Sequence, residues 1–288
     1  MNLRDGLGLV KFSHSVFALP FALMGAWLAA GGVPAPRVLG LVVIAAVAAR
    51  TAAMGFNRLV DRHIDAANPR TAERELPAGR VTPGQARGLV LLSSVVFIAA
   101  AFALNTACGL AAPLVLLVLL GYSFAKRFTA LVHFWLGLAL GLAPPAAWLA
   151  VRGDFAGDLL VPLALGLAVL TWVAGFDLIY SCQDAAFDRD RGLHSVPARL
   201  GVARSLRIAR GLHVATVALL ALVMTRADLG WLFGVALVAA ALLLVWEHSI
   251  VSADDLSRVD MAFFTLNGWV GIGLFVGTAL DLSLLGHG

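Results

Sequence analysis

Long apolar segments alternate with short polar ones along almost the whole chain. Each apolar segment is about 20 residues long, the length of α-helix that crosses roughly 30 Å of hydrocarbon. Nine segments are expected to be transmembrane helices, at residues 12–31, 38–58, 86–105, 109–125, 131–151, 159–182, 207–225, 230–251 and 261–281. The pattern therefore predicts an all-α integral membrane bundle that forms one domain over residues 1–288.

Composition supports this prediction, because 60% of the 288 residues are hydrophobic and 13% are charged. Basic residues concentrate after the second, fourth, sixth and eighth spans and at the N-terminus, in Arg4 and Lys11. The opposite loops contain only Arg37, Arg152 and Arg226. The positive-inside rule places the N-terminus on the cytoplasmic side of a cell inner membrane. The net charge of +4 follows from this distribution, and the sequence contains no recognisable nucleic-acid-binding module.

Three polar residues are regularly spaced where the second span ends. Asn57, Asp61 and Asp65 are four residues apart, so successive side chains turn by only about 40° on a helix and share one face. Carboxylates at this position are costly, and they oppose the helix dipole, which favours cations at a helix C-terminus. The arrangement therefore requires a counter-charge, for which a divalent metal is a candidate.

A second acidic set follows the sixth span. Asp177, Asp184 and Asp188 are separated by seven and four residues, so a helix would place them on one face with Tyr180 beside them. Each acidic set precedes a basic segment that contains proline, RTAERELPAGRVT at 70–82 and GLHSVPARLGVARS at 192–205. We interpret the two regions, around 50–82 and 177–205, as two half-sites of a weak internal repeat that close on each other.

Arg50 lies inside the second span, seven residues before Asn57 and hence on the same helix face. An arginine within a membrane span costs roughly 2.5 to 3.5 kcal/mol even on the insertion scale and usually faces a cavity or an anion. Two acidic ladders, one intramembrane arginine and two basic loops predict a charged pocket that opens to the cytoplasm. Such a pocket suits an amphiphile with an anionic head and a hydrocarbon tail.

These motifs together resemble the UbiA superfamily of intramembrane aromatic prenyltransferases. The resemblance rests on the ladder from Asn57 to Asp65 with Arg50 before it, RTAERELPAG after it, YSFAKRFT at 122–129, and the second ladder followed by GLHS. It implies a nine-helix fold and a prenyl transfer from a polyprenyl diphosphate to an aromatic acid, with Mg²⁺ as cofactor.

The resemblance also implies roles for individual residues. The residues expected to hold Mg²⁺ are Asn57, Asp61, Asp65, Asp184 and Asp188. Lys126 and Arg70 are expected to help hold the diphosphate leaving group, whereas Arg50 and Asp177 are expected near the acceptor. The five aspartates are the candidate catalytic residues. Mg²⁺ commonly binds through one or two carboxylates together with phosphate oxygens, which suits paired ladders that face a diphosphate.

Three further residues are candidates for binding substrate. Tyr180 shares the face of the second ladder, Arg127 follows Lys126 in the chain, and His194 follows the second ladder. The other histidines, among them His133, have no metal-ligand spacing and are interpreted as packing or interfacial residues.

The acceptor stays open between two aromatic acids. His194 and Ser195 stand where benzoate-type members often have Lys-Ser, and Arg58 follows Asn57 where many members have Asp. The segment YSCQDAAFDRDRGLHSVPARLG resembles a subgroup assigned to menaquinone synthesis through the futalosine route. A 4-hydroxybenzoate acceptor leading to ubiquinone and a dihydroxynaphthoate acceptor leading to menaquinone both carry a phenol and a carboxylate, so Arg50 suits either.

Two alternatives remain at this point. Haem or polycyclic acceptors occur within the same superfamily. A transporter would also contain intramembrane charges and repeated halves, although its site is expected near the midplane of the membrane rather than near one face.

Overall fold

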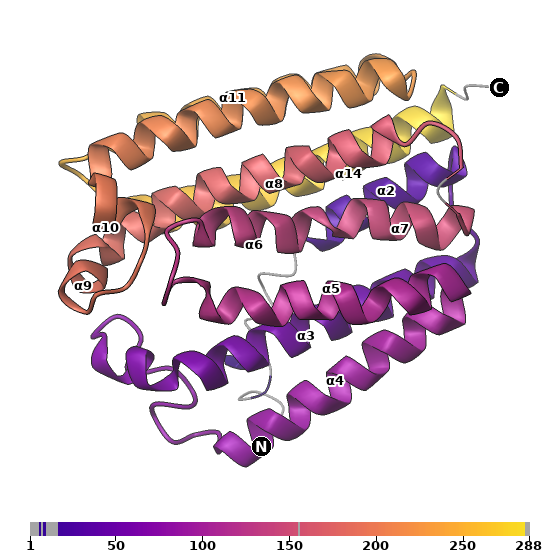
Figure 1. Ribbon diagram of the computed structural model, residues 1–288. Helices are drawn as coiled ribbons and strands as arrows, with labels where there is room; N and C mark the ends of the chain where they lie inside the picture. Colours follow the sequence, from indigo (N-terminus) through magenta and orange to yellow (C-terminus); the bar gives the residue numbers. More distant parts are fainter. Residues whose placement is uncertain (1–5, 7, 10–16, 155, 286–288) are drawn as a thin grey trace.

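Long helices that lie side by side form the bundle in Figure 1, a computed structural model that describes residues 6, 8–9, 17–154 and 156–285. Arg4, Lys11 and the start of the expected span 12–31 lie outside the described residues. The first helices are α2 (Leu19–Ala30), α3 (Pro36–Ala67), α4 (Pro83–Leu104) and α5 (Thr106–Ala125). They are followed by α6 (Val132–Gly141), α7 (Ala143–Arg152) and α8 (Leu160–Ser181).

The second half of the chain begins with short elements and ends with long ones. The short elements are a 3₁₀ turn η2 (Cys182–Asp184), α9 (Ala185–Asp190) and α10 (Val196–Leu200). The remaining elements are α11 (Val202–Arg226), α12 (Trp231–Ser249), α13 (Val259–Met261), a π-helical turn η3 (Ala262–Leu266) and α14 (Asn267–Leu284). No strand occurs in the described part of the chain, which confirms the predicted all-α class.

Eight of the nine expected spans correspond to helical segments that are long and apolar enough to cross a membrane. The first expected span corresponds within the described residues to the shorter apolar helix α2. The fifth span consists of α6 and α7, which together form the apolar helical segment Val132–Arg152. The described residues thus confirm the helical membrane architecture.

Helix α3 is longer than its apolar segment and carries the first ladder in its last three turns. It contains 32 residues and ends at Ala67, where Asn68 adopts an extended conformation before Pro69. The next helix begins with a capping box, in which the Thr82 hydroxyl accepts from the Gln85 amide and the Gln85 side chain accepts from the Thr82 amide. These signals end α3 and start α4 on either side of the basic loop.

Helix α8 lies at the centre of the bundle, since 72% of its most apolar stretch is buried, against 22% for that of α5. Glycines let α6 approach it closely: a Cβ at Gly141 would lie 2.6 Å from the Gly166 carbonyl oxygen, and one at Gly137 would lie 2.4 Å from that of Leu170. Small residues at helix contacts are typical of membrane bundles, because they allow the backbones to pack against each other.

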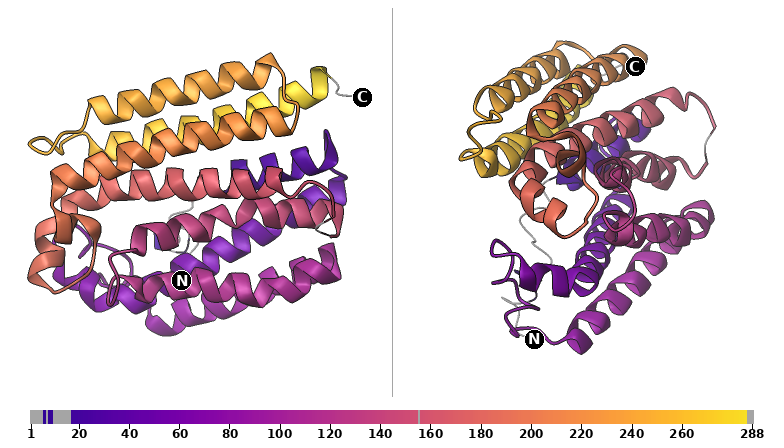
Figure 2. Two further views of the ribbon diagram at one scale, coloured as in Figure 1. Left: turned by 45° about the horizontal axis from the view of Figure 1, so that its top comes forward. Right: turned by 60° about the vertical axis from the view of Figure 1, so that its left-hand side comes forward.

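The segment after α3 and the segment of η2, α9 and α10 after α8 lie at the same end of the bundle in both orientations of the molecule (Figures 1 and 2). The fold therefore brings the two predicted half-sites to one end, although more than 90 residues lie between them in the sequence.

We expect Gly137→Ala to lower the thermal unfolding temperature in detergent, because the added Cβ would overlap the Leu170 carbonyl oxygen. Overpacking of this kind costs about 1 to 3 kcal/mol. Gly88→Ala is the matched control, since nothing lies within 4 Å of a Cβ at this position. Alanine also stabilises an exposed helix position relative to glycine. Equal melting temperatures for the two variants would contradict close contact between α6 and α8.

Candidate active site

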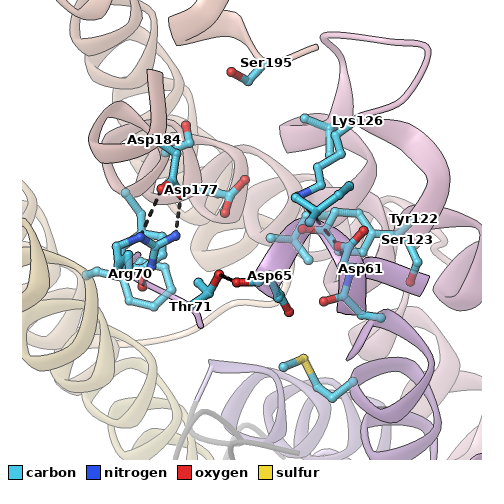
Figure 3. A pocket seen from close by; sticks show the side chains of 18 of the residues that line it. Asp61, Asp65, Arg70, Thr71, Tyr122, Ser123, Lys126, Asp177, Asp184 and Ser195 are labelled. Carbon is cyan, nitrogen blue, oxygen red and sulfur yellow. Dashed lines mark hydrogen bonds and ion pairs between the residues drawn. The ribbon is translucent and has the colours of Figure 1, made fainter. Parts of the chain in front are cut away.

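A cavity of about 740 Å³ lies between the two half-sites (Figure 3). Its lining combines residues of α3, α5, α6 and α8 with residues of the segments that follow α3 and α8. In Figure 3, Asp184 and Arg70 lie on one side, and Asp61, Asp65 and Lys126 lie on the other. The structure thus brings the two acidic ladders face to face.

The first ladder is neutralised from a neighbouring helix end. Asp61 Oδ1 accepts from Arg127 Nη2 at 2.9 Å, and Asp61 Oδ2 lies 3.7 Å from Lys126 Nζ. Asn57 Nδ2 donates to Asp61 Oδ2 at 3.1 Å, as expected for side chains four residues apart on one helix face. Both basic residues belong to the YSFAKRFT segment, so this motif supplies the counter-charge for the ladder.

Asp65 is buried to the same degree as Asp61, with 4% of its surface exposed. Its Oδ1 accepts from Arg74 Nη1 at 2.7 Å, and its Oδ2 lies 3.9 Å from Nη1 of the buried Arg58. Thr71 donates its hydroxyl to the Asp65 backbone carbonyl at 3.0 Å and ties the basic loop to the helix end. Asp65 Oδ2 is buried yet accepts no hydrogen bond from the described residues.

Arg70 joins the two half-sites. Its guanidinium binds both carboxylate oxygens of Asp184 through Nε and Nη2, and its Nη1 donates to the Tyr180 hydroxyl at 2.8 Å. Asn68 Nδ2 also donates to Asp184 Oδ1, at 3.2 Å. Burial opposes the charged form of Arg70, but the hydrogen bond and the negative charge of Asp184 outweigh it and raise the pKa of Arg70 above its ordinary value.

The second ladder is not one continuous helix. Helix α8 ends at Ser181, and the 3₁₀ turn η2 separates it from α9. The change in helical period alters the angles that were expected between the aspartates, yet Asp177, Asp184 and Asp188 all line the cavity. The predicted common location is therefore correct, whereas the uniform helix on which it was based is not.

Asp177 differs from Asp61, Asp65 and Asp184 in its partner. Among the described residues it forms an ion pair with neither Lys nor Arg; His133 Nδ1 lies 2.7 Å from its Oδ2 instead. His133 Nε2 accepts from the Val196 amide at 3.3 Å, so Nδ1 carries the proton and donates to Asp177. His133 lines the cavity, which corrects its interpretation as a packing residue.

The remaining sequence candidates occupy different places. Arg50, Lys126 and Tyr180 line the cavity, as expected. Arg127 is outside the described lining but holds Asp61. His194 is also outside this lining; its ring lies 3.2 Å from Arg199 Nη2, and its amide donates to the Lys126 carbonyl at 2.7 Å.

Several lining residues were not among the predicted site residues. They are Arg58, Asn68, Thr71, Arg74, Tyr122, Ser123, His133 and Ser195. Arg74 belongs to the basic segment at 70–82, and Arg58 follows Asn57 in the first ladder. Tyr122 and Ser123 belong to YSFAKRFT, so the motifs contained a signal for these residues. His133 has no such local signal, because its partner Asp177 is contributed by another helix.

Another part of the wall is apolar. The nonpolar lining residues include Phe17, Leu136, Leu140, Val173, Phe176, Phe263 and Phe264. The cavity therefore combines a charged end with a hydrocarbon surface, which suits an amphiphilic ligand with an anionic head.

The donor set at the charged end fits Mg²⁺. Carboxylate and amide oxygens are its preferred protein ligands, and Asp65 Oδ2 offers a buried acceptor without a hydrogen-bond donor. No group of three or more His, Cys, Asp or Glu side chains in the described ranges 17–154 and 156–285 is arranged to hold an ion by itself. Mg²⁺ usually keeps several waters and binds through one or two carboxylates together with phosphate oxygens of a substrate.

Comparison with known proteins places the chain in a family. The model of the UbiA prenyltransferase family matches residues 18–269. Because this match covers most of the chain, the protein belongs to the UbiA prenyltransferase family and is an integral membrane prenyltransferase.

Individual relatives agree with this assignment. A 4-hydroxybenzoate octaprenyltransferase of Nitrosomonas europaea is 30% identical over 90% of this chain and 87% of its own length. A mitochondrial 4-hydroxybenzoate polyprenyltransferase of Arabidopsis thaliana is 32% identical, and the chain covers 61% of that longer protein.

Solved structures share the fold. The apo structure of a UbiA homologue from Aeropyrum pernix K1 has a TM-score of 0.84 and 37% identity over 93% of this chain and 98% of its own. A UbiA homologue from Archaeoglobus fulgidus bound to DMAPP and Mg²⁺ has a TM-score of 0.76 and 19% identity, covering 97% of this chain and 99% of that chain.

We expect Asp65→Ala to destabilise the protein more than Asp184→Ala. Asp65 faces Arg58, whose side chain is 5% exposed, so its removal leaves a buried charge without compensation, at about 3 to 5 kcal/mol. The Arg70 side chain that faces Asp184 is 32% exposed and is solvated more easily, so the loss is about 1 kcal/mol. Thermal unfolding of the two variants in detergent measures the difference, and an equal loss would contradict this account.

Proposed function

We propose that the protein transfers a polyprenyl group from a polyprenyl diphosphate to the ring of a hydroxylated aromatic acid, in a Mg²⁺-dependent reaction of respiratory quinone synthesis. The observation that carries this proposal is the cavity in which two acidic ladders and their basic partners meet an apolar wall. The Archaeoglobus fulgidus homologue with DMAPP and Mg²⁺ supports the donor, and the 4-hydroxybenzoate relatives support the acceptor class.

The acidic ladders are proposed to bind the metal and the diphosphate. The residues that would hold Mg²⁺ are Asn57, Asp61, Asp65, Asp184 and Asp188. When bound, Mg²⁺ supplies positive charge that stabilises the departing diphosphate. Lys126 and Arg70 now neutralise aspartates, and they lie where they are able to add fixed positive charge to the phosphate oxygens. Arg127 assists by holding Asp61.

Arg50 and Asp177 are proposed to act on the aromatic acceptor. Arg50 lines the cavity and would bind the carboxylate of the acid, because a guanidinium matches that group with two hydrogen bonds. A ring carbon forms a bond to C1 of the prenyl chain as the bond from C1 to the diphosphate oxygen breaks. Asp177 then accepts the ring proton, and the electron pair of that C–H bond restores aromaticity.

Two features make Asp177 suitable as this base. Its charge is not compensated by an ion pair with Lys or Arg in the described structure, and His133 orients it through a hydrogen bond. The apolar walls exclude water from the reactive prenyl group. Tyr180 and His194 complete the proposed substrate-binding set. Tyr180 contributes by accepting a hydrogen bond from Arg70, and His194 contacts Arg199 and the Lys126 backbone.

Mass spectrometry of the products tests the function directly. Purified protein with Mg²⁺ and a polyprenyl diphosphate is given 4-hydroxybenzoate and a dihydroxynaphthoate in competition, and we expect one of them to gain the prenyl mass. Asp61→Ala and Asp184→Ala should abolish the product, as should EDTA, because each removes part of the metal and diphosphate site. Absence of any product, under conditions in which a related enzyme works, would overturn the proposal.

Asp177→Asn tests the proton acceptor separately from donor binding. We expect kcat to fall about 100-fold or more, because positioned general bases typically contribute this much. The KM for polyprenyl diphosphate should stay within about twofold of the wild-type value, since Asp177 is outside the proposed metal set. His133→Ala should lower kcat less, because it removes only the orienting hydrogen bond. A large rise in donor KM with unchanged kcat would instead assign Asp177 to the diphosphate site.

A further inference from the structure

A polar cluster lies among apolar helices outside the lining of the cavity. Glu247 of α12 is 1% exposed, and Asn267, the first residue of α14, is fully buried. Glu247 Oε1 accepts from Asn267 Nδ2 at 2.9 Å, whereas Oε2 accepts no hydrogen bond and lies 3.8 Å from His213 Nδ1. Ionisable groups at such positions in membrane helices are costly and usually have a function.

Asn267 uses all of its side-chain hydrogen-bonding groups except one acceptor lone pair. Its two amide N–H groups donate hydrogen bonds to Glu247 Oε1 and to the Ala262 carbonyl, the latter at 3.0 Å. Its Oδ1 accepts from Trp172 Nε1 at 2.6 Å. A single side chain therefore links α12, α8 and the beginning of the turn that precedes α14. We call this set, Asn267 with Glu247, Trp172 and Ala262, the Asn267 lock.

The turn that Asn267 closes is unusual. Residues Ala262–Leu266 form a π-helical turn, and the Ala262 carbonyl that accepts from the Asn267 side chain lies at its start. Such wide turns are rare and frequently occur at functional sites. Here the turn places Phe263 and Phe264 in the wall of the cavity. The lock thus fixes the part of the backbone from which these rings extend.

From Phe263 a chain of contacts leads to the second ladder. The Phe263 ring lies against the Tyr180 ring, with centroids 4.2 Å apart and planes inclined by 31°. The Tyr180 hydroxyl accepts from Arg70, whose guanidinium holds Asp184 and lies 5.2 Å from the centre of the Tyr180 ring. Each step is a direct contact between packed groups, as physical coupling between separate parts of a protein requires.

We propose that Asn267, held by Glu247 and Trp172, is a positioning residue for the diphosphate end of the cavity. It fixes the π-turn that sets Phe263 against Tyr180, and Tyr180 in turn aligns Arg70 beside Asp184. This inference rests on the proposed function in assigning the second ladder to the diphosphate. The buried Glu247 is thereby given a role in binding the prenyl donor, although it does not touch the cavity.

Asn267→Leu removes the three hydrogen bonds of the lock at similar side-chain volume. We expect the dissociation constant of polyprenyl diphosphate with Mg²⁺, and its KM, to rise about 10-fold, the loss expected for one charge-assisted hydrogen bond. The KM of the aromatic acceptor should not change. Thr278→Val is the matched control: Thr278 is fully buried on the same helix and is hydrogen-bonded to the Leu274 carbonyl, so its loss affects stability without affecting donor binding.

A double-mutant cycle with Tyr180→Phe tests the route of the effect. Phenylalanine keeps the ring that packs on Phe263 but loses the hydroxyl that accepts from Arg70. If Asn267 acts through this hydroxyl, Asn267→Leu should raise the donor dissociation constant by less than about twofold in the Tyr180→Phe background. The proposal would be overturned if the fold-changes of Asn267→Leu and Tyr180→Phe in the donor dissociation constant simply multiplied in the double variant. It would also be overturned if Asn267→Leu raised this constant no more than Thr278→Val does.

Variants of Glu247 test the same proposal if Asn267→Leu does not fold. Glu247→Gln retains an oxygen acceptor for Asn267 and should bind the donor within about twofold of wild type, whereas Glu247→Leu should weaken binding. Equal binding by the two variants would contradict the lock. If the wild-type protein binds the donor but forms no product, the proposed function is wrong. The role of Asn267 can still be tested in that case, because donor binding by the variants does not depend on product formation.

Discussion

Ion pairing between buried aspartates and basic side chains is the interaction on which the charged end of this protein depends. Carboxylates placed between apolar helices are stable only when they are compensated, and here the compensation comes largely from other segments. Arg74 and Arg127 neutralise Asp65 and Asp61, while Arg70 reaches from the first half-site to Asp184 in the second. Arg70 thus connects the two half-sites across the charged end of the cavity.

The same pairing bears on the proposed binding of an anionic ligand and a cation. Lys126 and Arg70 are already placed beside the carboxylates, so a diphosphate with Mg²⁺ would exchange partners within one cluster rather than bring charge into an apolar space. Asp177 is outside this exchange, since its described partner is the neutral donor His133. The charge-compensated end and the proposed base Asp177 are thus separate parts of the cavity.

Packing of uncharged groups controls the other side of the cavity. The π-turn before α14, the Phe263 ring and Tyr180 form a continuous contact that reaches Arg70. Polar groups buried in an apolar bundle must satisfy one another, and Asn267 does so for Trp172 and for Glu247 Oε1. Groups far from the charged end therefore influence its geometry through rigid packing.

Sequence patterns predicted the elements well where local physics decides them. The apolar segments located the spans, and the spacing of Asn57, Asp61 and Asp65 predicted one helix face, because helical period depends on the backbone alone. The second ladder was predicted less accurately, since the 3₁₀ turn at Cys182–Asp184 interrupts the helix without a clear sequence signal. The common location of its aspartates nevertheless followed from the motif.

The amino-acid pattern was sufficient to predict a helical membrane bundle with two acidic ladders and basic loops, because hydrophobic length, helical period and the cost of buried charge act locally. The packing of the helices determines which base neutralises which acid, and it brings His133 to Asp177. It also decided that Asn267 connects Glu247 with the cavity wall. These pairings join residues that are far apart in the chain, and side-chain contacts of that kind depend on how the helices pack.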